Sequence, residues 1–182
     1  MPSRPSADAH VSEPPSGDLA SRREALLAHV AGCPTPGTLA AVFHELGRLA
    51  AGGPAHVGLF EAALDYVDAR VDCADFVMHG ILRLLLQFGE DPRLPAGLLR
   101  RARETVLGFK YWPDEPGVDS LCSWTENHQI LFAAAAHLAG QRHPDAIFAN
   151  SGLSGRELAR VARPRILRWL ELRFRTGFSE WL

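Results

Sequence analysis

The chain has 182 residues, of which 47% are hydrophobic and 22% are charged, and its formal net charge is −2 at pH 7. This length fits one domain that buries roughly two-thirds of the surface of the unfolded chain. The small net charge excludes a general attraction to nucleic acids or to anionic membranes, so we expect neither as a partner.

Composition divides the chain into two parts. Residues 1–16 are rich in Pro and Ser and carry almost nothing that could form a core, so we predict a flexible N-terminal leader. Residues 17–182 form the predicted helical domain. The leader lacks the apolar segment of a secretory signal. The longest apolar run, from Ile130 to Ala136, is too short to span a bilayer. We therefore expect a soluble, cytoplasmic protein.

Apolar residues that recur at three-and-four spacing predict seven helices, separated by Gly and Pro. We expect them at about 18–32, 38–51, 57–70, 72–88, 95–110, 123–140 and 154–175. Thr38 is the expected N-cap of the second helix, and Pro95 the first residue of the fifth. No alternation typical of a β-strand persists. The pattern indicates an all-α fold of antiparallel helical hairpins, either an array or a toroid.

Residues of several chemical types gather between Asp119 and His128. Ser123 followed by Glu126 matches a capping box at the start of the sixth helix, and Trp124 and His128 are four residues apart on one helix face. Together with Asn127, they supply the aromatic plane, carboxylate and hydrogen-bond donors that a sugar site needs. The alternative is structural: Glu126 closes the cap, His128 is a core residue, and Trp124 is a packing anchor.

Three other segments contain aromatic or charged residues that suit a binding site. The predicted loop at 111–122 contains Tyr111 and Trp112, and loops of that length in compact domains are usually functional or disordered; we favour an ordered one. Glu180, beside Trp181, could form the opposite wall of a cleft, or the segment could be a helix cap with hydrophobic anchors. The arginines of the last helix are interrupted by acidic residues and by Pro164, which favours a solvated face over a phosphate-binding one.

The sequence gives no motif for a metal or a cofactor. Cys33, Cys73 and Cys122 are far apart, no pair has zinc-like spacing, and the histidines form no recognised metal motif. Their odd number and wide spacing do not suit a disulfide framework either. We therefore expect no bound metal or cofactor, and a reducing compartment.

Five segments carry a resemblance to known proteins. They are Tyr111–Pro116, Ser123–Phe132, Leu138–Gln141, Asn150–Gly155 and Arg173–Trp181. They resemble a poorly characterised group of large, mostly bacterial α-helical proteins with the α/α-toroid scaffold of six-hairpin glycosidases and heparinase- or alginate-lyase-like enzymes. The resemblance is close only from residue 111 onward.

The resemblance implies roles for particular residues. Asn127 and His128 look like the Asn–His pair that neutralises a uronate in toroidal lyases, and Glu126 stands where many lyases have an amide, which leaves a hydrolase open. It implies catalytic roles for Glu126, His128 and Glu180. The implied substrate contacts are Trp124, Asn127, Asp119, Tyr111 and Trp112.

A closed toroid of that kind has many more helices than the seven that we predict. We therefore expect an incomplete ring, the N-terminal part of a larger toroid, whose open apolar edge favours self-association. The expected function is a carbohydrate-active one, hydrolase or lyase, acting on an oligo- or polysaccharide, with the activity of this short form left open. The alternative is a non-catalytic helical module that binds a protein partner through the open edge.

Overall fold

The computed structural model describes residues 17–33 and 41–178, in which the chain forms seven helices. Apart from one antiparallel bridge between Ile147 and Ser154, these ranges contain no β-structure, which confirms the all-α prediction for them. The predicted leader at 1–16, Thr38 and Glu180 lie outside the described residues. The helices are α1 Leu19–Gly32, α2 Ala41–Ala50, α3 Val57–Asp68, α4 Ala74–Phe88, α5 Ala96–Gly108, α6 Glu126–Arg142 and α7 Gly155–Thr176.

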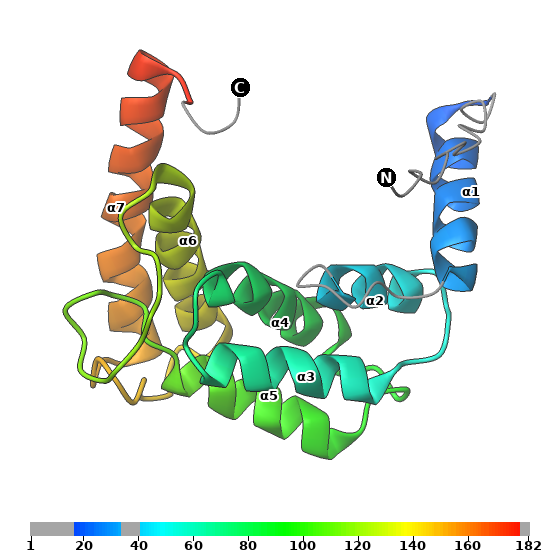
Figure 1. Ribbon diagram of the computed structural model, residues 1–182, viewed down its shortest axis with the longest axis horizontal. Coiled ribbons are helices and arrows are strands. Elements are labelled where there is room, and N and C mark those ends of the chain that lie inside the picture. Colours follow the sequence, from blue (N-terminus) through cyan, green and yellow to red (C-terminus); the bar gives the residue numbers. More distant parts are fainter. Residues whose placement is uncertain (1–16, 34–40, 179–182) are drawn as a thin grey trace, which may run out of the picture.

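The helices form a base with a projecting element at each end (Figure 1). Helices α2 to α5 make up the base, in which α4 runs antiparallel to both α3 and α5. The antiparallel pair of α6 and α7 rises from one end, and α1 rises from the other, where it packs against α2. The predicted helical hairpins are thus present, whereas their closure into part of a toroid stays a prediction.

Helix α4 is the centre of the core, because it packs against α2, α3, α5 and α6. Met78, Ile81 and Leu84 on α4 are completely buried. Gly80 lets α2 approach closely, since a Cβ atom at this position would lie 2.6 Å from Cγ1 of Val42. The strongly apolar composition of this segment therefore predicts its inner position correctly.

Small residues decide how closely α6 and α7 pack. A Cβ atom on Gly140 would lie 2.3 Å from the carbonyl oxygen of Gly155, and one on Gly155 would lie 2.1 Å from that of His143. Ala136 and Ala139 on the same helix are completely buried. Glycine and alanine at these positions let the two backbones approach closely.

Two predicted helix starts were wrong. Helix α6 begins at Glu126 with Thr125 as its N-cap, so Ser123 is a loop residue and forms no capping box. The capping box occurs instead on α7, between Ser154 and Glu157. Pro95 is the N-cap of α5 and not its first helical residue, because its ψ of 137° is extended.

Helix α1 is the least buried element. None of its residues is buried, and Leu19 and Leu26 are exposed. Its end is tied to α2 by Arg48, whose Nη1 donates to the carbonyl oxygen of Cys33 at 2.8 Å. Among the helices that the structure describes, none has the length and apolar character needed to cross a bilayer.

Candidate functional site

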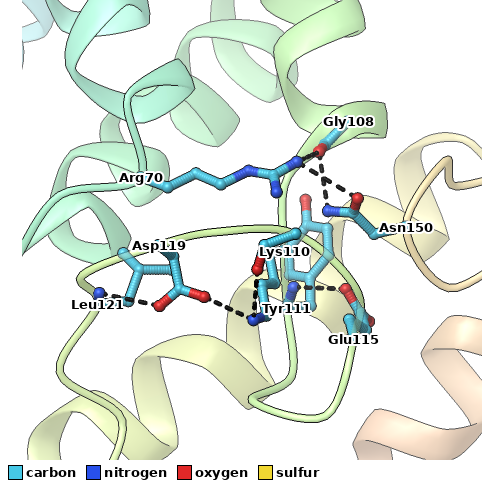
Figure 2. A network of polar contacts seen from close by, with 9 residues as sticks. Arg70, Gly108, Lys110, Tyr111, Glu115, Asp119, Leu121 and Asn150 are labelled. Atoms are coloured by element: carbon cyan, nitrogen blue, oxygen red, sulfur yellow. Dashed lines mark hydrogen bonds and ion pairs between the residues drawn. The ribbon is translucent and has the colours of Figure 1, made fainter.

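The loop between α5 and α6, residues 109–125, is fixed by an ion pair at its base (Figure 2). The Lys110 ammonium donates to Oδ2 of Asp119 at 2.5 Å and to the carbonyl oxygen of Gly117 at 3.2 Å. The other oxygen of Asp119 accepts from the backbone N–H of Leu121. The hydrogen bond from Lys110 lowers the pKa of Asp119. Asp119, a predicted substrate contact, thus holds the shape of the loop.

Tyr111 anchors the same loop to the core. Its hydroxyl donates to the carbonyl oxygen of Val106 at 2.9 Å, and its backbone N–H donates to Oε2 of Glu115 at 3.0 Å. Burial raises the pKa of both side chains, that of Tyr111 well above its ordinary value. Buried polar atoms of this kind need partners inside the protein, so these two bonds fix where the loop can lie.

A third anchor joins distant segments to the loop, and no sequence pattern predicted it. The Arg70 guanidinium donates to the carbonyl oxygen of Gly108 at 2.8 Å and to Oδ1 of Asn150 at 3.3 Å (Figure 2). The side-chain amide of Asn150 donates to the same carbonyl at 3.1 Å. The backbone oxygen of Arg70 accepts from Ser120. Arg70 thereby holds both Gly108, just before the loop, and Ser120 within it, and Asn150 holds Gly108.

The fixed loop, α6 and α7 line an open hollow of about 500 Å³. Aromatic side chains form much of its wall: Tyr111, Trp112, Phe132 and Trp169. The polar groups of the wall are Ser123, Gln129, Arg165 and Arg168. Concave sites that bind small molecules are typically roughly 300–1,000 Å³, mostly apolar, with a few polar groups. The hollow has both properties and is the candidate site.

Two residues of this wall, Trp112 and Arg165, contact each other. The Arg165 guanidinium carbon lies 3.7 Å from the centroid of a Trp112 ring, in a cation–π arrangement. The indole nitrogen of Trp112 is buried and has no hydrogen-bond partner within the described structure. A buried donor without a partner costs free energy.

Glu126, the predicted general acid or base, is largely buried and does not line the hollow. Its carboxylate forms an ion pair with the Arg173 guanidinium. Its backbone oxygen accepts from the indole N–H of Trp169 at 2.8 Å. These contacts fasten the start of α6 to the end of α7, so the geometry gives Glu126 a structural use, and its catalytic role stays a prediction.

His128 and Asn127 are not among the residues that line the hollow either. Nδ1 of His128 lies 2.7 Å from Oδ2 of Asp75, and the ring packs edge-on against Phe76. Oδ1 of Asn127 accepts from the Thr125 hydroxyl at 2.6 Å and from the backbone N–H of His128 at 2.7 Å. The implied uronate-binding roles of both residues therefore gain no support from the hollow.

Of the remaining predicted site residues, some line the hollow and others do not. Tyr111 and Trp112 line the hollow, and both, with Asp119, also line a smaller adjoining recess of about 70 Å³. Trp124 is 75% exposed and lies outside both. Glu180 falls beyond the described ranges. The structure thus brings two of the eight predicted residues to the main hollow.

The predicted site residues did not include the part of the wall that α7 contributes: Arg165, Arg168, Trp169 and Leu172. The arginines of the last helix were expected on a solvated face; Arg165 and Arg168 are indeed exposed, and they line the hollow together with Trp169. The spacing of these residues could have indicated a common surface, because helix positions three and four apart lie on one face. A basic and aromatic stripe on that face would have pointed to a binding surface.

Comparison with known protein families, with curated proteins and with solved structures found no match to this chain. The function is therefore argued from the geometry of the hollow, and the resemblance to toroid enzymes stays a prediction.

Proposed function

We propose that the protein binds a small molecule with a carboxylate and a ring, such as a sugar acid within an oligosaccharide, in the hollow between the 109–125 loop, α6 and α7. One observation carries the proposal. The wall of the hollow combines the guanidinium groups of Arg165 and Arg168 with the indoles of Trp112 and Trp169.

The charge of the wall selects the ligand. Among the described residues that line the hollow, two are arginines and none is a carboxylate. Guanidinium groups form paired, charge-assisted hydrogen bonds with carboxylates, which is their strongest recognition mode in proteins. An anionic ligand therefore gains more than a neutral one of the same size.

The aromatic wall selects for a ring. Trp112 and Trp169 are largely buried, and the small exposed parts of their rings give the hollow apolar wall against which the C–H face of a sugar ring can pack. Ser123 and Gln129 supply neutral polar groups for hydroxyls. This set of groups agrees with the carbohydrate class that the sequence resemblance implies, and we propose binding without assigning a reaction.

The test is calorimetric titration of the full chain with uronate-containing oligosaccharides and with neutral oligosaccharides of equal length. We expect binding of the acidic set alone. Arg168→Gln should weaken it by about tenfold, the equivalent of roughly 1.4 kcal/mol. Arg163→Gln is the matched control, because Arg163 is an exposed arginine on α7 outside the hollow. Equal affinity for neutral and acidic ligands, or equal loss in the two variants, would contradict the proposal.

A second candidate is self-association, which one observation favours. Helix α7 carries Phe174, which is 81% exposed, and the half-exposed Leu167. Large exposed apolar side chains on one element are typical of interaction surfaces. Light scattering over a concentration series should show a dimer that Phe174→Ser abolishes, and a monomer at every concentration would exclude it.

A further inference from the structure

A second cluster of chemically active side chains lies apart from the hollow. Asp72, Cys122 and His128 each offer a ligand atom, and these atoms all lie within 4.8 Å of one another. They come from three segments: the α3–α4 connection, the loop before α6 and the first turn of α6. The fold therefore assembles a carboxylate oxygen, a sulfur and an imidazole nitrogen at one point.

We propose that Asp72, Cys122 and His128 bind a divalent transition-metal ion, with Zn²⁺ as the best match. Zn²⁺ is held by carboxylate, thiolate and imidazole in tetrahedral sites, and a thiolate ligand disfavours Mg²⁺ and Ca²⁺, which prefer oxygen. Asp72 is exposed and His128 is buried, so the cluster opens to solvent on one side. Three protein ligands with one open position is the arrangement of zinc sites that retain a water molecule.

Asp75 supplies an independent argument for the site. Its Oδ2 lies 2.7 Å from Nδ1 of His128, and its side chain is 1% exposed. Metal-bound histidines usually donate their second N–H to a carboxylate, which fixes the ring and its tautomer. Because Nδ1 of His128 faces Asp75, Nε2 is the nitrogen left to coordinate a metal ion.

The second oxygen of Asp75 strengthens this argument. Oδ1 is buried and has no hydrogen-bond partner among the described residues. A buried carboxylate that is incompletely satisfied is costly, and a nearby cation reduces this cost. A divalent ion on His128 would place positive charge next to Asp75 in this way.

The metal site and the hollow use different residues. Ser123 and Gln129 line the hollow, whereas their sequence neighbours Cys122 and His128 belong to the cluster with Asp72. Failure of one proposal therefore leaves the other intact. A bound ion would also join the start of α4 to the start of α6, two elements that already pack together.

The test is metal titration of the full chain after reduction and treatment with a chelator. Co²⁺ is the first probe, because a cobalt–thiolate bond gives an intense near-ultraviolet band and tetrahedral Co²⁺ a strong visible band. Zn²⁺ should then displace it with a stoichiometry of one per chain. Cys122→Ser should remove the thiolate band. Asp75→Asn should weaken Zn²⁺ binding about 10- to 100-fold, as expected for the partner of a ligating histidine.

Two further variants test whether metal binding depends on the cluster itself and not on the fold. Cys33→Ser should bind Co²⁺ and Zn²⁺ as the wild type does, because Cys33 lies at the end of α1 outside the cluster. Asp72 is exposed, so Asp72→Asn should keep the helical circular dichroism of the wild type and still bind more weakly. A folded wild type that takes up no Co²⁺ or Zn²⁺ would overturn the proposal. Persistence of the thiolate band in Cys122→Ser, or its loss in Cys33→Ser, would do the same.

Discussion

The carboxylate of Glu126, the first residue of α6, is paired with the guanidinium of Arg173 near the end of α7. Both side chains are largely shielded from solvent, with 6% and 17% of their surface exposed. Trp169 donates to the backbone oxygen of Glu126 from the same helix. The residue that resembles a catalytic acid is thus part of the contact that closes the α6–α7 hairpin.

Neutralising Glu126 should therefore destabilise the fold. We expect Glu126→Gln to lower the free energy of unfolding by about 2 kcal/mol, the usual range for a hydrogen bond to a charged group, because Arg173 keeps its charge without its partner. Urea unfolding followed by circular dichroism measures this. Glu171→Gln is the control, since the Glu171–Arg175 pair on α7 is well exposed and should change stability by less than about 0.5 kcal/mol. Equal stability of both variants and the wild type would contradict the structural role.

Gly140→Ala should destabilise the α6–α7 hairpin. The added methyl group would meet the backbone of Gly155 and Ala159, which cannot move as a side chain can. We expect a loss of about 1–3 kcal/mol, as for overpacked cores, measured by thermal or urea unfolding. In Gly58→Ala the new methyl group meets nothing within 4 Å, so helix propensity should leave this variant unchanged or up to about 1 kcal/mol more stable. The same sign of change in both variants would argue against the close approach.

Asp119→Asn should loosen the 109–125 loop. It removes the charge that holds Lys110 and weakens the acceptor for the N–H of Leu121. We expect backbone amides in residues 111–122 to exchange with solvent about tenfold faster, which corresponds to roughly 1.4 kcal/mol less protection. Hydrogen exchange with mass spectrometry measures it. Asp114→Asn changes an exposed carboxylate of the same loop and should leave the exchange as in the wild type.

Stability should fall in mild acid because of His143. Burial, aided by the charges of Arg142 and Arg103, lowers the pKa of His143 from 6.5 to about 4. Between these values the unfolded chain takes up a proton that the folded chain does not, so this contribution to stability is lost as the pH falls from 6.5 to 4. Burial also lowers the pKa of His79, so this residue changes stability in the same direction.

The measurement is a nuclear magnetic resonance titration of the His143 ring, combined with urea unfolding at pH 7 and pH 4.5. His143→Gln should lose less stability over this interval than the wild type does. A ring that titrates near 6.5 in the folded protein would contradict the prediction.

The capping-box motif shows what a local pattern can and cannot predict. Ser followed by Glu three residues later occurs at Ser123–Glu126 and again at Ser154–Glu157, and only the second pair forms a capping box. At the first position the Glu126 carboxylate bonds to Arg173, which lies 47 residues further along the chain. A window of four residues contains no information about such a partner.

Local sequence patterns predicted the seven helices, the inner position of α4 and the place of the long loop. These features depend on apolar spacing over a few residues and on Gly and Pro, both of which act locally. The folded arrangement of the helices brings together side chains that no local pattern pairs: Arg165 with Trp112, Glu126 with Arg173, and His128 with Asp75, 53 residues away. Such pairs form when separate helices pack, and their partners are set by the packing of the whole chain rather than by the neighbours of each residue.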